Sequence, residues 1–432
     1  MVGNLRLGIA GLGTVGVGVV KLVESRQEAF INMFNKTAMI TAVNARSKSR
    51  DRGVSLDKFE WFDDARELAK SSSIDVFVEL IGGDEGIARE SVTIALENGK
   101  HVVTANKALI AKHGVELAKI AEANNVALMF EAAVAGGIPI IRVMSQSVIA
   151  NEITHIAGIM NGTCNYILTT MAKEGRDFKD VLAEAQAKGY AEADPTFDVG
   201  GIDTAHKLAI LTSLAFGTEV DFDSIYIEGI EENTAEDIKN TDNLGFNIKL
   251  LGMALKTPNG IEQRVHPALV AKTSSIAAVD DVNNAVYIES KMLDGIMLEG
   301  KGAGEGPTAS SVVGDILQIL RGQIEPVFIT PVAKLKPYEK ARMNRHEGGY
   351  YIALNVKNKV GALAAISERM AEFDISIDSL IQQKDDGDDV VIPVTIITEE
   401  TSESEIRAAL KKIDNDGFLA SHSRVIRIEK FA

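Results

Sequence analysis

The sequence of 432 residues contains a single cysteine, Cys164. One thiol cannot form a disulfide within the chain or a thiolate metal cluster, and this scarcity is typical of a reducing compartment. The seven histidines are scattered along the chain, without the HxH or HExxH spacing of a zinc site. We therefore predict chemistry that needs no zinc.

Excess positive charge and long apolar runs are also missing. The formal net charge is −16, which argues against nucleic acid as a partner, because binding phosphates needs a basic face. No apolar run approaches the roughly 20 residues that span a bilayer, and the candidate at 126–144 contains Glu131, two glycines and Pro139. The first residues lack a signal-peptide pattern, since their apolar run ends in glycines. We expect a cytoplasmic protein that binds neither nucleic acid nor a membrane.

Glycine spacing near the N-terminus predicts a dinucleotide-binding domain. An apolar strand at 5–10 leads into Gly11, Gly13 and Gly16, and an amphipathic helix follows. In such a loop the glycines permit a tight turn, a close approach to the pyrophosphate and close helix packing. Further apolar strands at 38–43, 74–83, 101–107 and 126–137 alternate with helical segments. This alternation predicts an α/β fold with a Rossmann-type, doubly wound sheet.

The carboxyl edge of that sheet is where a ligand is expected. The second strand is followed by Arg46, Lys48 and Arg50, and the first acid after it is Asp51. This pattern favours NADP over NAD, because a 2′-phosphate needs positive charge where NAD needs an acid. The alternative is a solvated basic loop. Gly82 and Lys107, which end two other strands, should lie at the same edge, although Lys107 could also be a surface lysine.

The segment 158–207 has the composition expected of a catalytic site. Asp203 and Lys207 are spaced i,i+4 at the start of an otherwise apolar helix, and Glu192, Asp194 and Asp198 precede them on a loop. The alternative is a surface ion pair of little energetic value. However, carboxylates can hold the ammonium group of an amino-acid substrate, while a lysine stabilises and protonates a carbonyl oxygen during hydride transfer.

The remaining sequence predicts three further parts. Segments at 225–230 and 263–300 suggest antiparallel strands of an open sheet in an α+β domain, with a dimer as the simplest cover for that sheet. A glycine loop precedes a helix at about 307–320, which either returns to the first domain or caps the second. Residues 323–346 suggest a linker with three prolines. The order βαββαβ after it predicts a ferredoxin-like unit.

Several motifs together resemble the homoserine dehydrogenases, in the monofunctional bacterial form with a C-terminal ACT domain. They are GLGTVG, TANK, EAAVAGGIPI, GIMNGTCNYILTTM, GYAEADPTFDVGGIDTAHKLAIL and GAGEGPTASSVVGDI, and they cover roughly residues 5–320. The resemblance implies a Rossmann domain at 1–137, a catalytic and dimerisation domain at 138–322, a linker at 323–346 and a regulatory ACT domain at 347–432. It implies a homodimer or homotetramer.

The resemblance also implies an activity and its residues. The activity is the reversible NAD(P)-dependent reduction of L-aspartate 4-semialdehyde to L-homoserine, on the route to threonine, methionine and isoleucine. Lys207 matches the proton donor, Glu192 and Asp203 match residues that bind the substrate's amino end, and Lys107 matches a lysine near substrate and cofactor. The matching cofactor positions include Thr14, Val15, Arg46 and Gly304 in addition to the first glycines.

Two ligands are implied only by this resemblance. A sodium ion would bind at Glu131, Val134, Gly136 and Ile138, through backbone carbonyls that suit a hard cation. An amino-acid effector, threonine, would bind the ACT domain. The loop there, Asn358-Lys359-Val360-Gly361, departs from the frequent Asp-x-Pro-Gly by losing its proline.

Two rival functions fit the residues less well. One is a dehydrogenase of a related amino-acid aldehyde, since side-chain length cannot be inferred from the loop. The other is a catalytically silent amino-acid sensor that uses the ACT domain. A sensor would have no need for Lys107, Glu192, Asp203 and Lys207 together.

Overall fold

The first part of the chain forms the predicted parallel sheet. Its strands are β1 (Leu5–Ala10), β2 (Ala38–Asn44), β3 (Glu60–Phe62), β4 (Val76–Glu79), β5 (His101–Thr104) and β6 (Leu128–Met129). They lie in the order β3-β2-β1-β4-β5-β6, and all are parallel. The helices are α1 (Thr14–Ser25), α2 (Gln27–Phe34), α3 (Ala65–Lys70), α4 (Ile87–Glu97) and α5 (Lys107–Ala123). The computed structural model describes residues 4–341, 346–382 and 391–431, and it confirms the predicted α/β class.

One strand is shorter than its apolar sequence suggests. The prediction of a strand over 126–137 is wrong beyond Met129, because the chain turns into the 3-10 helix η1 (Glu131–Ala133). The buried carboxylate of Glu131 accepts the backbone N–H groups of Ile141 and Arg142 at 2.8 and 2.9 Å. It thereby holds a tight turn before α6 (Ile140–Arg142) and the π-helical turn η2 (Val143–Ser147).

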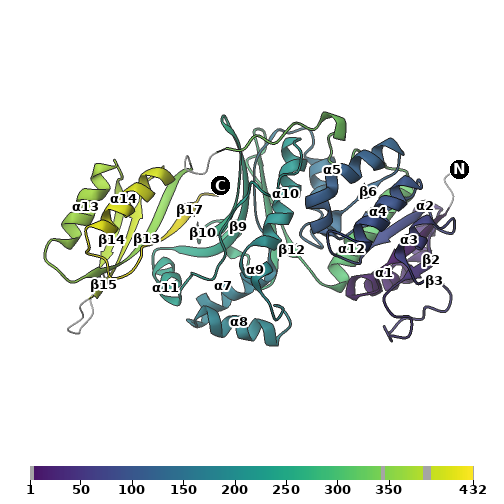
Figure 1. Cartoon of the computed structure of the whole chain (residues 1–432), viewed down its shortest axis with the longest axis horizontal. Coiled ribbons are helices and arrows are strands. Elements are labelled where there is room, and N and C mark those ends of the chain that lie inside the picture. Colours follow the sequence, from purple (N-terminus) through teal and green to yellow (C-terminus); the bar gives the residue numbers. More distant parts are fainter. Residues whose placement is uncertain (1–3, 342–345, 383–390, 432) are drawn as a thin grey trace.

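A helix from much later in the chain covers part of the first sheet. This helix, α12 (Glu305–Arg321), packs against α1, and its Val312 and Ile316 share a buried cluster with Val19 and Val23. Close approach depends on Gly18, where an added Cβ would lie 2.7 Å from the Glu305 side chain. The first sheet is therefore covered both by a helix that directly follows its first strand and by a helix that begins much later in the chain, at Glu305 (Figure 1).

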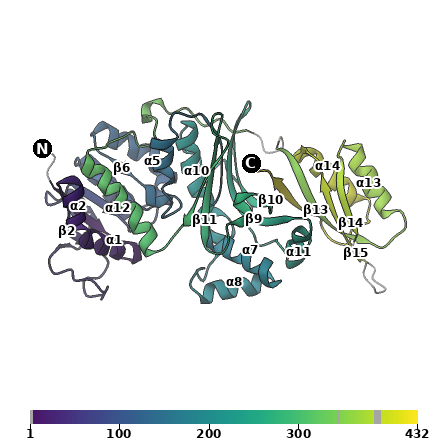
Figure 2. The same ribbon diagram turned by 180° about the vertical axis from the view of Figure 1, so that it is seen from behind.

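The middle part is a mixed sheet with helices on one side. It contains β7 (Ile153–Ile159), β8 (Tyr226–Ile227), β9 (Phe246–Thr257), β10 (Gly260–Ala271), β11 (Asn283–Ser290) and β12 (Ile296–Lys301). The helices are α7 (Gly162–Glu174), α8 (Phe178–Ala187), α9 (Thr196–Val199), α10 (Ile202–Phe216) and α11 (Ala235–Asn243). Figures 1 and 2 show α7, α8 and α11 gathered beside the long strands.

The expected open face of this sheet is not open. Ala157, Leu251 and Val270 lie in a cluster with Ile276 of η3 (Ser275–Ala278), and all are buried within one chain. Phe431 packs on the same cluster. The chain covers that face itself, so of the two grounds for expecting a dimer, an exposed face or an exposed edge, only the edge of the sheet is left.

The C-terminal part has the predicted ferredoxin-like order. It runs β13 (Glu347–Lys357), α13 (Ala362–Glu372), β14 (Ile377–Gln382), β15 (Val391–Thr398), β16 (Thr401–Ser402), α14 (Glu403–Asn415) and β17 (Arg424–Glu429). The polar hairpin expected between the two middle strands falls on 383–390, outside the described residues. Three residues of β17 pair in parallel with β10, Arg427 opposite Ala268 among them. This pairing joins the two parts into one eleven-stranded sheet.

The segment predicted as a linker is packed rather than free. Residues 342–345 of it lie outside the described ranges. Phe328 is fully buried and its ring centroid lies 5.8 Å from that of Phe130. Lys336 and Lys340 form isolated β-bridges with Thr218 and Ile261, after the short η4 (Val332–Lys334). The segment therefore straps the first part to the second. Among the described residues, no helix is long and apolar enough to cross a membrane.

Candidate active site

Two lysines and one aspartate meet where the first two parts of the molecule touch. Lys107 begins α5, and Asp203 and Lys207 lie one turn apart near the start of α10. Asp203 bridges the lysines: Oδ1 is 2.9 Å from Nζ of Lys107, and Oδ2 is 2.7 Å from Nζ of Lys207. Lys207 also donates to the carbonyl oxygen of Met160 at 2.6 Å. The arrangement places two ammonium groups beside one shared carboxylate.

Burial and charge set the protonation of these groups. Asp203 is 3% exposed; burial opposes its ionisation, but the charges of Lys207 and Lys107 outweigh burial and lower the pKa of Asp203 far below its usual range. Burial lowers the pKa of Lys207, and Asp203 only partly offsets that effect. Burial also acts against Lys107, but Asp203 raises its pKa overall. Lys207 is therefore the lysine that can more readily release a proton.

An asparagine orders the acids around the lysines. The Asn161 side-chain amide donates to Asp198 and Asp203, both at 2.8 Å, while its oxygen accepts the Cys164 N–H and caps α7. Thr163, which follows on the first turn, donates its hydroxyl to the Tyr190 carbonyl at 2.7 Å. Asn161 takes the cap because it precedes the first helical residue, where its side chain reaches the free N–H groups.

The two other acids of the loop lie outside this cluster. Asp194 is exposed and accepts the Thr196 N–H at 3.1 Å, so it shapes the loop. The Glu192 side chain is exposed and makes no contact with either lysine in the described part of the chain. Asp198 is half-buried, and burial raises its pKa. Of the three loop acids, the structure brings only Asp198 to the lysines.

The glycine loop has the geometry that its spacing predicted. Gly11 has a φ of +101°, and an added Cβ would lie 2.3 Å from the Leu80 carbonyl oxygen. At Gly16 an added Cβ would lie 2.0 Å from the Gly11 oxygen, whereas Gly13 borders open space. Thr14 and Val15 follow at the N-terminus of α1, which has no side-chain cap. The loop therefore leaves free N–H groups and room for a phosphate.

The basic loop after β2 is exposed, as a phosphate-binding loop must be. Arg46, Lys48 and Arg50 all face solvent. Arg52 fixes the loop: its guanidinium donates to the Ser47 and Arg50 carbonyls at 2.6 and 2.8 Å and to the Leu12 carbonyl of the glycine loop at 3.1 Å. The positive charge therefore lies next to the predicted nucleotide site.

The predicted sodium loop and the late glycine loop lie against each other. Ala135 and Gly136 have φ angles of +54° and +53°, and the Gly137 N–H donates to the Lys301 carbonyl at 3.0 Å. An added Cβ at Gly136 would lie 2.2 Å from the Gly302 oxygen. Gly304 has a φ of +114° and is the N-cap of α12. In the described part of the chain, no group of His, Cys, Asp and Glu side chains could hold a metal ion.

Comparison with known sequences identifies the family. The family descriptions "Homoserine dehydrogenase" and "Homoserine dehydrogenase, NAD binding domain" match residues 139–317 and 11–131, and "ACT domain" matches 350–415. The homoserine dehydrogenase of Neisseria gonorrhoeae is 41% identical over 431 residues, 98% of each chain. That of Pseudomonas aeruginosa is 42% identical and covers 95% of each. The chain belongs to the homoserine dehydrogenase family.

Solved homoserine dehydrogenases share its fold. The crystal structure from Thiobacillus denitrificans superposes with a TM-score of 0.93, at 38% identity and 99% coverage of each chain. A hyperthermophilic archaeal homoserine dehydrogenase in complex with NADPH has a TM-score of 0.61 at 26% identity, covering 73% of this chain and 97% of that one. The chain is thus an oxidoreductase with a nicotinamide-nucleotide domain and an ACT domain.

The sequence patterns did not predict a role for Glu79. This residue ends β4 and is fully buried. One oxygen accepts the N–H groups of Ile81 and Gly82 at 2.7 and 3.0 Å, and the other accepts the Thr104 hydroxyl at 2.5 Å. The Thr104 hydroxyl in turn accepts the N–H of Asn106, the residue before Lys107, at 2.9 Å. Glu79 thus fixes two loops at the carboxyl edge of the sheet. An acid at the end of an apolar strand was the available signal.

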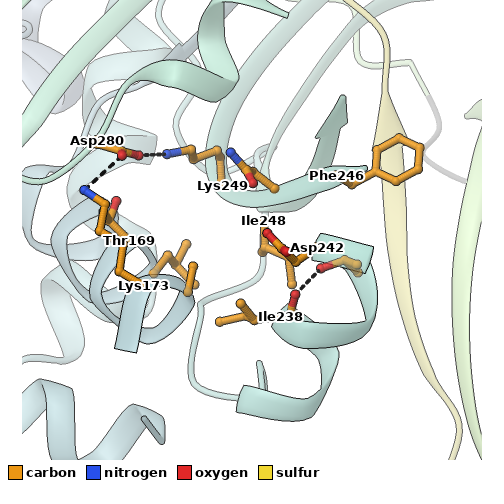
Figure 3. A pocket seen from close by; sticks show the side chains of 12 residues that line it. Thr169, Lys173, Ile238, Asp242, Phe246, Ile248, Lys249 and Asp280 are labelled. Atoms are coloured by element: carbon orange, nitrogen blue, oxygen red, sulfur yellow. Dashed lines mark hydrogen bonds and ion pairs between the residues drawn. The ribbon is translucent and has the colours of Figure 1, made fainter. Parts of the chain in front are cut away.

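In a polar pocket elsewhere in the molecule, the charged side chains already pair with one another and with the backbone (Figure 3). It has a volume of about 170 Å³ and lies between α7, α11 and β9. The buried Lys249 donates to the Val279 carbonyl at 2.6 Å and to Asp280 at 3.1 Å, and Lys173 pairs with the same aspartate at 3.1 Å. These lysines hold the domain together, and we assign the pocket no ligand.

Proposed function

We propose that the chain reversibly reduces L-aspartate 4-semialdehyde to L-homoserine with NADPH. The observation that carries this proposal is the buried Lys107–Asp203–Lys207 cluster at the junction of the nucleotide-binding and catalytic parts. Negative charge develops on an aldehyde oxygen during reduction, and a preorganised ammonium group stabilises it. The same cluster offers a carboxylate to the substrate's ammonium group.

Lys207 is the proposed proton donor, and NADPH, when bound, would provide the hydride. As the new C–H bond forms at the carbonyl carbon, the oxygen takes a proton from Nζ of Lys207, which becomes neutral and is reprotonated from solvent. The reverse reaction requires neutral Lys207 to accept the hydroxyl proton of homoserine. Burial lowers the pKa of Lys207, so this lysine releases its proton more readily than an ordinary lysine does.

Substrate binding falls to three residues in this proposal. Asp203 and Glu192 bind the ammonium group, with Glu192 approaching from its exposed loop. Lys107, which is 32% exposed on its side chain, orients the substrate's other polar end and lies next to the cofactor. Loss of affinity for homoserine, without loss of NADPH binding, in Glu192→Gln would support this role; unchanged affinity would contradict it.

The proposed cofactor is NADP, with NAD as the weaker alternative. Gly11, Gly13, Thr14, Val15, Gly16 and Gly304 would surround the pyrophosphate side, and Arg46 would meet the 2′-phosphate. The exposed Arg46 and the absence of an acid at the end of β2 support this. The ratio of kcat/KM for NADP to that for NAD tests it, and Arg46→Ala should lower that ratio. A ratio that the substitution leaves unchanged would count against it.

Sodium binding is proposed at the carbonyl oxygens of Glu131, Val134, Gly136 and Ile138. The Glu131 carboxylate accepts the Ile141 and Arg142 N–H groups, and the Glu131 carbonyl accepts the Val134 N–H at 3.2 Å, so this carbonyl would bind sodium through its second lone pair. Activity measured in sodium-free potassium buffer and again after adding sodium tests the site. Identical activity in both buffers would rule out a functional sodium.

The wider setting follows from the same activity. We propose a cytoplasmic enzyme of threonine, methionine and isoleucine biosynthesis, inhibited by threonine through the ACT domain, and a homodimer or homotetramer. Light scattering coupled to size exclusion measures the assembly directly; a monomer at working concentration would refute it.

The decisive experiment follows nicotinamide absorbance with L-homoserine and NADP, and in reverse with L-aspartate 4-semialdehyde and NADPH. We expect turnover in both directions. No turnover in either direction, with a folded protein, would overturn the proposed function.

A further inference from the structure

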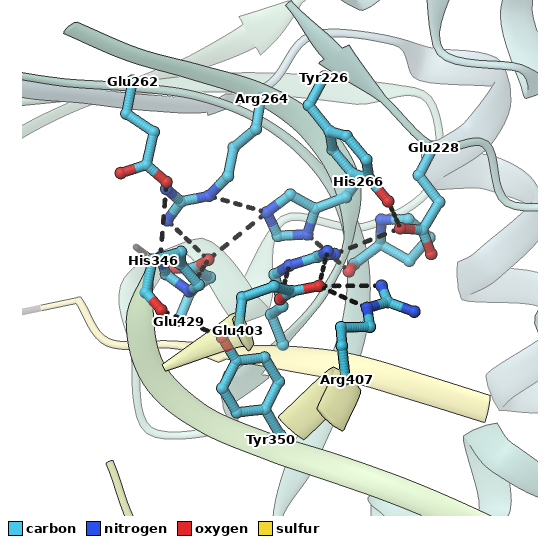
Figure 4. Close-up of polar contacts among 12 residues, drawn as sticks. Tyr226, Glu228, Glu262, Arg264, His266, His346, Tyr350, Glu403, Arg407 and Glu429 are labelled. Carbon is cyan, nitrogen blue, oxygen red and sulfur yellow. Dashed lines mark hydrogen bonds and ion pairs between the residues drawn. The ribbon is translucent and has the colours of Figure 1, made fainter. Parts of the chain in front are cut away.

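The buried cation at the junction of the catalytic and ACT domains has several partners (Figure 4). Arg427 of β17 pairs with Glu403 of α14 at 2.9 Å and with Glu228, which follows β8, at 3.2 Å. Its guanidinium also lies over the ring of Tyr226, 5.1 Å from the centroid. Because a long side chain loses rotational freedom only when several contacts hold it, carboxylates and an aromatic face together fix this one cation.

In the active site, Lys107 has fewer polar partners than the lysine beside it. Lys207 reaches two acceptors, the Met160 carbonyl oxygen at 2.6 Å and Oδ2 of Asp203 at 2.7 Å. Within the described residues, the only oxygen that pairs with Nζ of Lys107 is Oδ1 of Asp203, at 2.9 Å. The side chain of Lys107 is 32% exposed, against 9% for Lys207. A flexible four-carbon stem held at one point can rotate, so a second contact is needed to define where the Lys107 ammonium group lies.

The second contact of Lys107 is the aromatic ring of Phe197. Nζ of Lys107 lies over this ring, 5.7 Å from its centroid. Phe197 belongs to α9, directly precedes Asp198 and is 41% exposed. A single exposed apolar side chain needs no explanation by itself. Here, however, an active-site ammonium group lies over the exposed ring, and the negative face of an aromatic ring attracts such a group.

Two further rings hold Phe197 in place. The ring centroid of His206 lies 5.6 Å from that of Phe197 and 4.4 Å from that of Phe222. His206 is 5% exposed, and burial, followed by the charge of Lys107, lowers the pKa of its imidazole. The imidazole is therefore neutral near pH 7 and does not repel the ammonium group. The three rings form a neutral aromatic row, Phe222–His206–Phe197, that ends at Lys107.

We propose that Phe197 is a positioning residue, whose ring holds the Lys107 ammonium group by a cation–π contact and so directs this group toward the substrate. Asp203 fixes one side of the ammonium group and the ring fixes another, so its remaining N–H bonds point in a defined direction. Without the ring, substrate binding would have to order a mobile lysine, which weakens binding. The inference rests on the proposed function, in which Lys107 orients the substrate.

Removing the aromatic face while keeping an apolar side chain tests the contact. Phe197→Leu should lower kcat/KM for L-homoserine by about 2- to 30-fold, the usual strength of one cation–π contact, mainly by raising KM. Phe197→Tyr keeps an aromatic face and should retain kcat/KM. Because Phe197 is exposed, neither substitution should change the melting temperature. Unchanged kcat/KM in Phe197→Leu would overturn the positioning role.

Fluorinated phenylalanines at position 197 separate the electrostatic contact from the shape of the ring. Each added fluorine withdraws electron density from the ring face and changes the size of the ring little. The logarithm of kcat/KM should therefore fall stepwise as fluorine atoms are added, whereas a merely structural role would not respond. The matched control is Phe373→Leu, which removes a cation–π contact with Lys412 in the ACT domain, 4.9 Å from the ring centroid. This control should leave kcat/KM unchanged.

A measurement without turnover separates this inference from the proposed activity. Acetic anhydride acetylates neutral amines, and mass spectrometry of peptides gives the rate at each lysine. In Phe197→Leu the rate at Lys107, relative to that at Lys173, should rise about twofold or more, because loss of the ring uncovers the amine and lowers its pKa. An unchanged relative rate would overturn the contact. Absence of turnover in the unmodified chain would instead refute the proposed function, and the labelling would still decide whether the ring holds Lys107.

Discussion

At the scale of single residues, Lys207 combines two opposed requirements. Burial lowers its pKa, while Asp203 keeps an anion at 2.7 Å and limits the change. A surface lysine would hold its proton too firmly to exchange it near neutral pH, and an unpaired buried lysine would lose it altogether. Asp203 can serve both lysines because Asn161 holds its second oxygen in place.

Replacing Lys207 by alanine should reduce kcat by roughly 10²- to 10⁴-fold, the usual contribution of a positioned acid–base group. NADPH affinity, measured by fluorescence titration, should change little. Lys173→Ala removes another acid-paired lysine, far from the site, and is the matched control. A variant at Lys207 that keeps normal kcat would rule out its role as proton donor.

The direction of the pH dependence follows from the same lysine. Aldehyde reduction needs protonated Lys207, so its rate should fall as pH rises through the lysine's pKa. Homoserine oxidation needs the neutral form, so its rate should rise over the same interval. Because the pKa of Lys207 is lowered by burial, both changes should lie below the range of an ordinary lysine.

At the scale of elements, the N-terminal ends of α7 and α10 position the acidic side chains of the site. Asn161 caps α7 and holds Asp198 and Asp203 at once. A helix cap is worth about 0.5–2 kcal/mol, so a single side chain connects helix stability with the geometry of the site.

Asn161→Ala should therefore lower both the melting temperature and kcat. We expect a stability loss of about 0.5–2 kcal/mol and a fall in kcat of about tenfold or more, as a lost charged hydrogen bond implies. Ser402→Ala removes a comparable cap from α14 in the ACT domain and should lower stability while leaving kcat unchanged. Equal kcat in both variants would show that Asn161 acts only as a cap.

At the scale of the whole molecule, the ACT domain is part of the catalytic sheet. β17 pairs with β10, and Phe431 packs near His155 and Tyr287, with ring centroids 6.2 and 5.4 Å apart. Such an arrangement can transmit a change in one domain to the other, but it makes the catalytic part dependent on the C-terminal residues.

Truncation after residue 340 should therefore destabilise the enzyme rather than simply remove its regulation. It would expose the edge of β10 and leave Arg264 without Glu429. Exposed strand edges favour aggregation, so we expect a lower melting temperature and light scattering from aggregates. A truncated chain with the full-length melting temperature and kcat would contradict this dependence.

Stability should also depend on pH through the junction between the domains. Burial and Arg264 lower the pKa of His346 to about 3, against 6.5 in the unfolded chain. The groups that face His346 are Arg264, Arg427, His266, Glu262 and Glu429. Because the folded pKa is depressed, the neutral histidine's contribution is complete above pH 6.5 and is lost as pH falls toward 3.

Between pH 7 and pH 5 the melting temperature of the unmodified chain should fall, and His346→Gln should reduce that fall. The contribution of this histidine at pH 5 is of the order of 2 kcal/mol. Thermal unfolding at both pH values measures it, and the difference between the two proteins isolates His346 from the other buried histidines. An equal fall in melting temperature in both proteins would show that His346 does not cause the pH dependence of stability.

The sequence alone determined the features that depend on neighbouring residues. The glycine loop, the i,i+4 pair Asp203 and Lys207, the alternation of strands and helices and the βαββαβ order are all set by local periodicity and turn chemistry. The motifs around Gly189–Lys207 and the family they identify were likewise present in the sequence. Local hydrogen bonds and helix spacing do not depend on where the rest of the chain lies. The structure therefore agrees with these predictions.

Only the tertiary structure decided which distant residues meet. Lys107 reaches Asp203 because the strap around Phe328 and the helix α5 hold two parts of the chain together. Glu192 remains outside that cluster, and β17 closes onto β10. Such contacts depend on the packing of the whole core, which no short sequence pattern encodes. The hydrophobic effect is non-directional, so it favours the burial of an apolar residue without determining which residues it contacts.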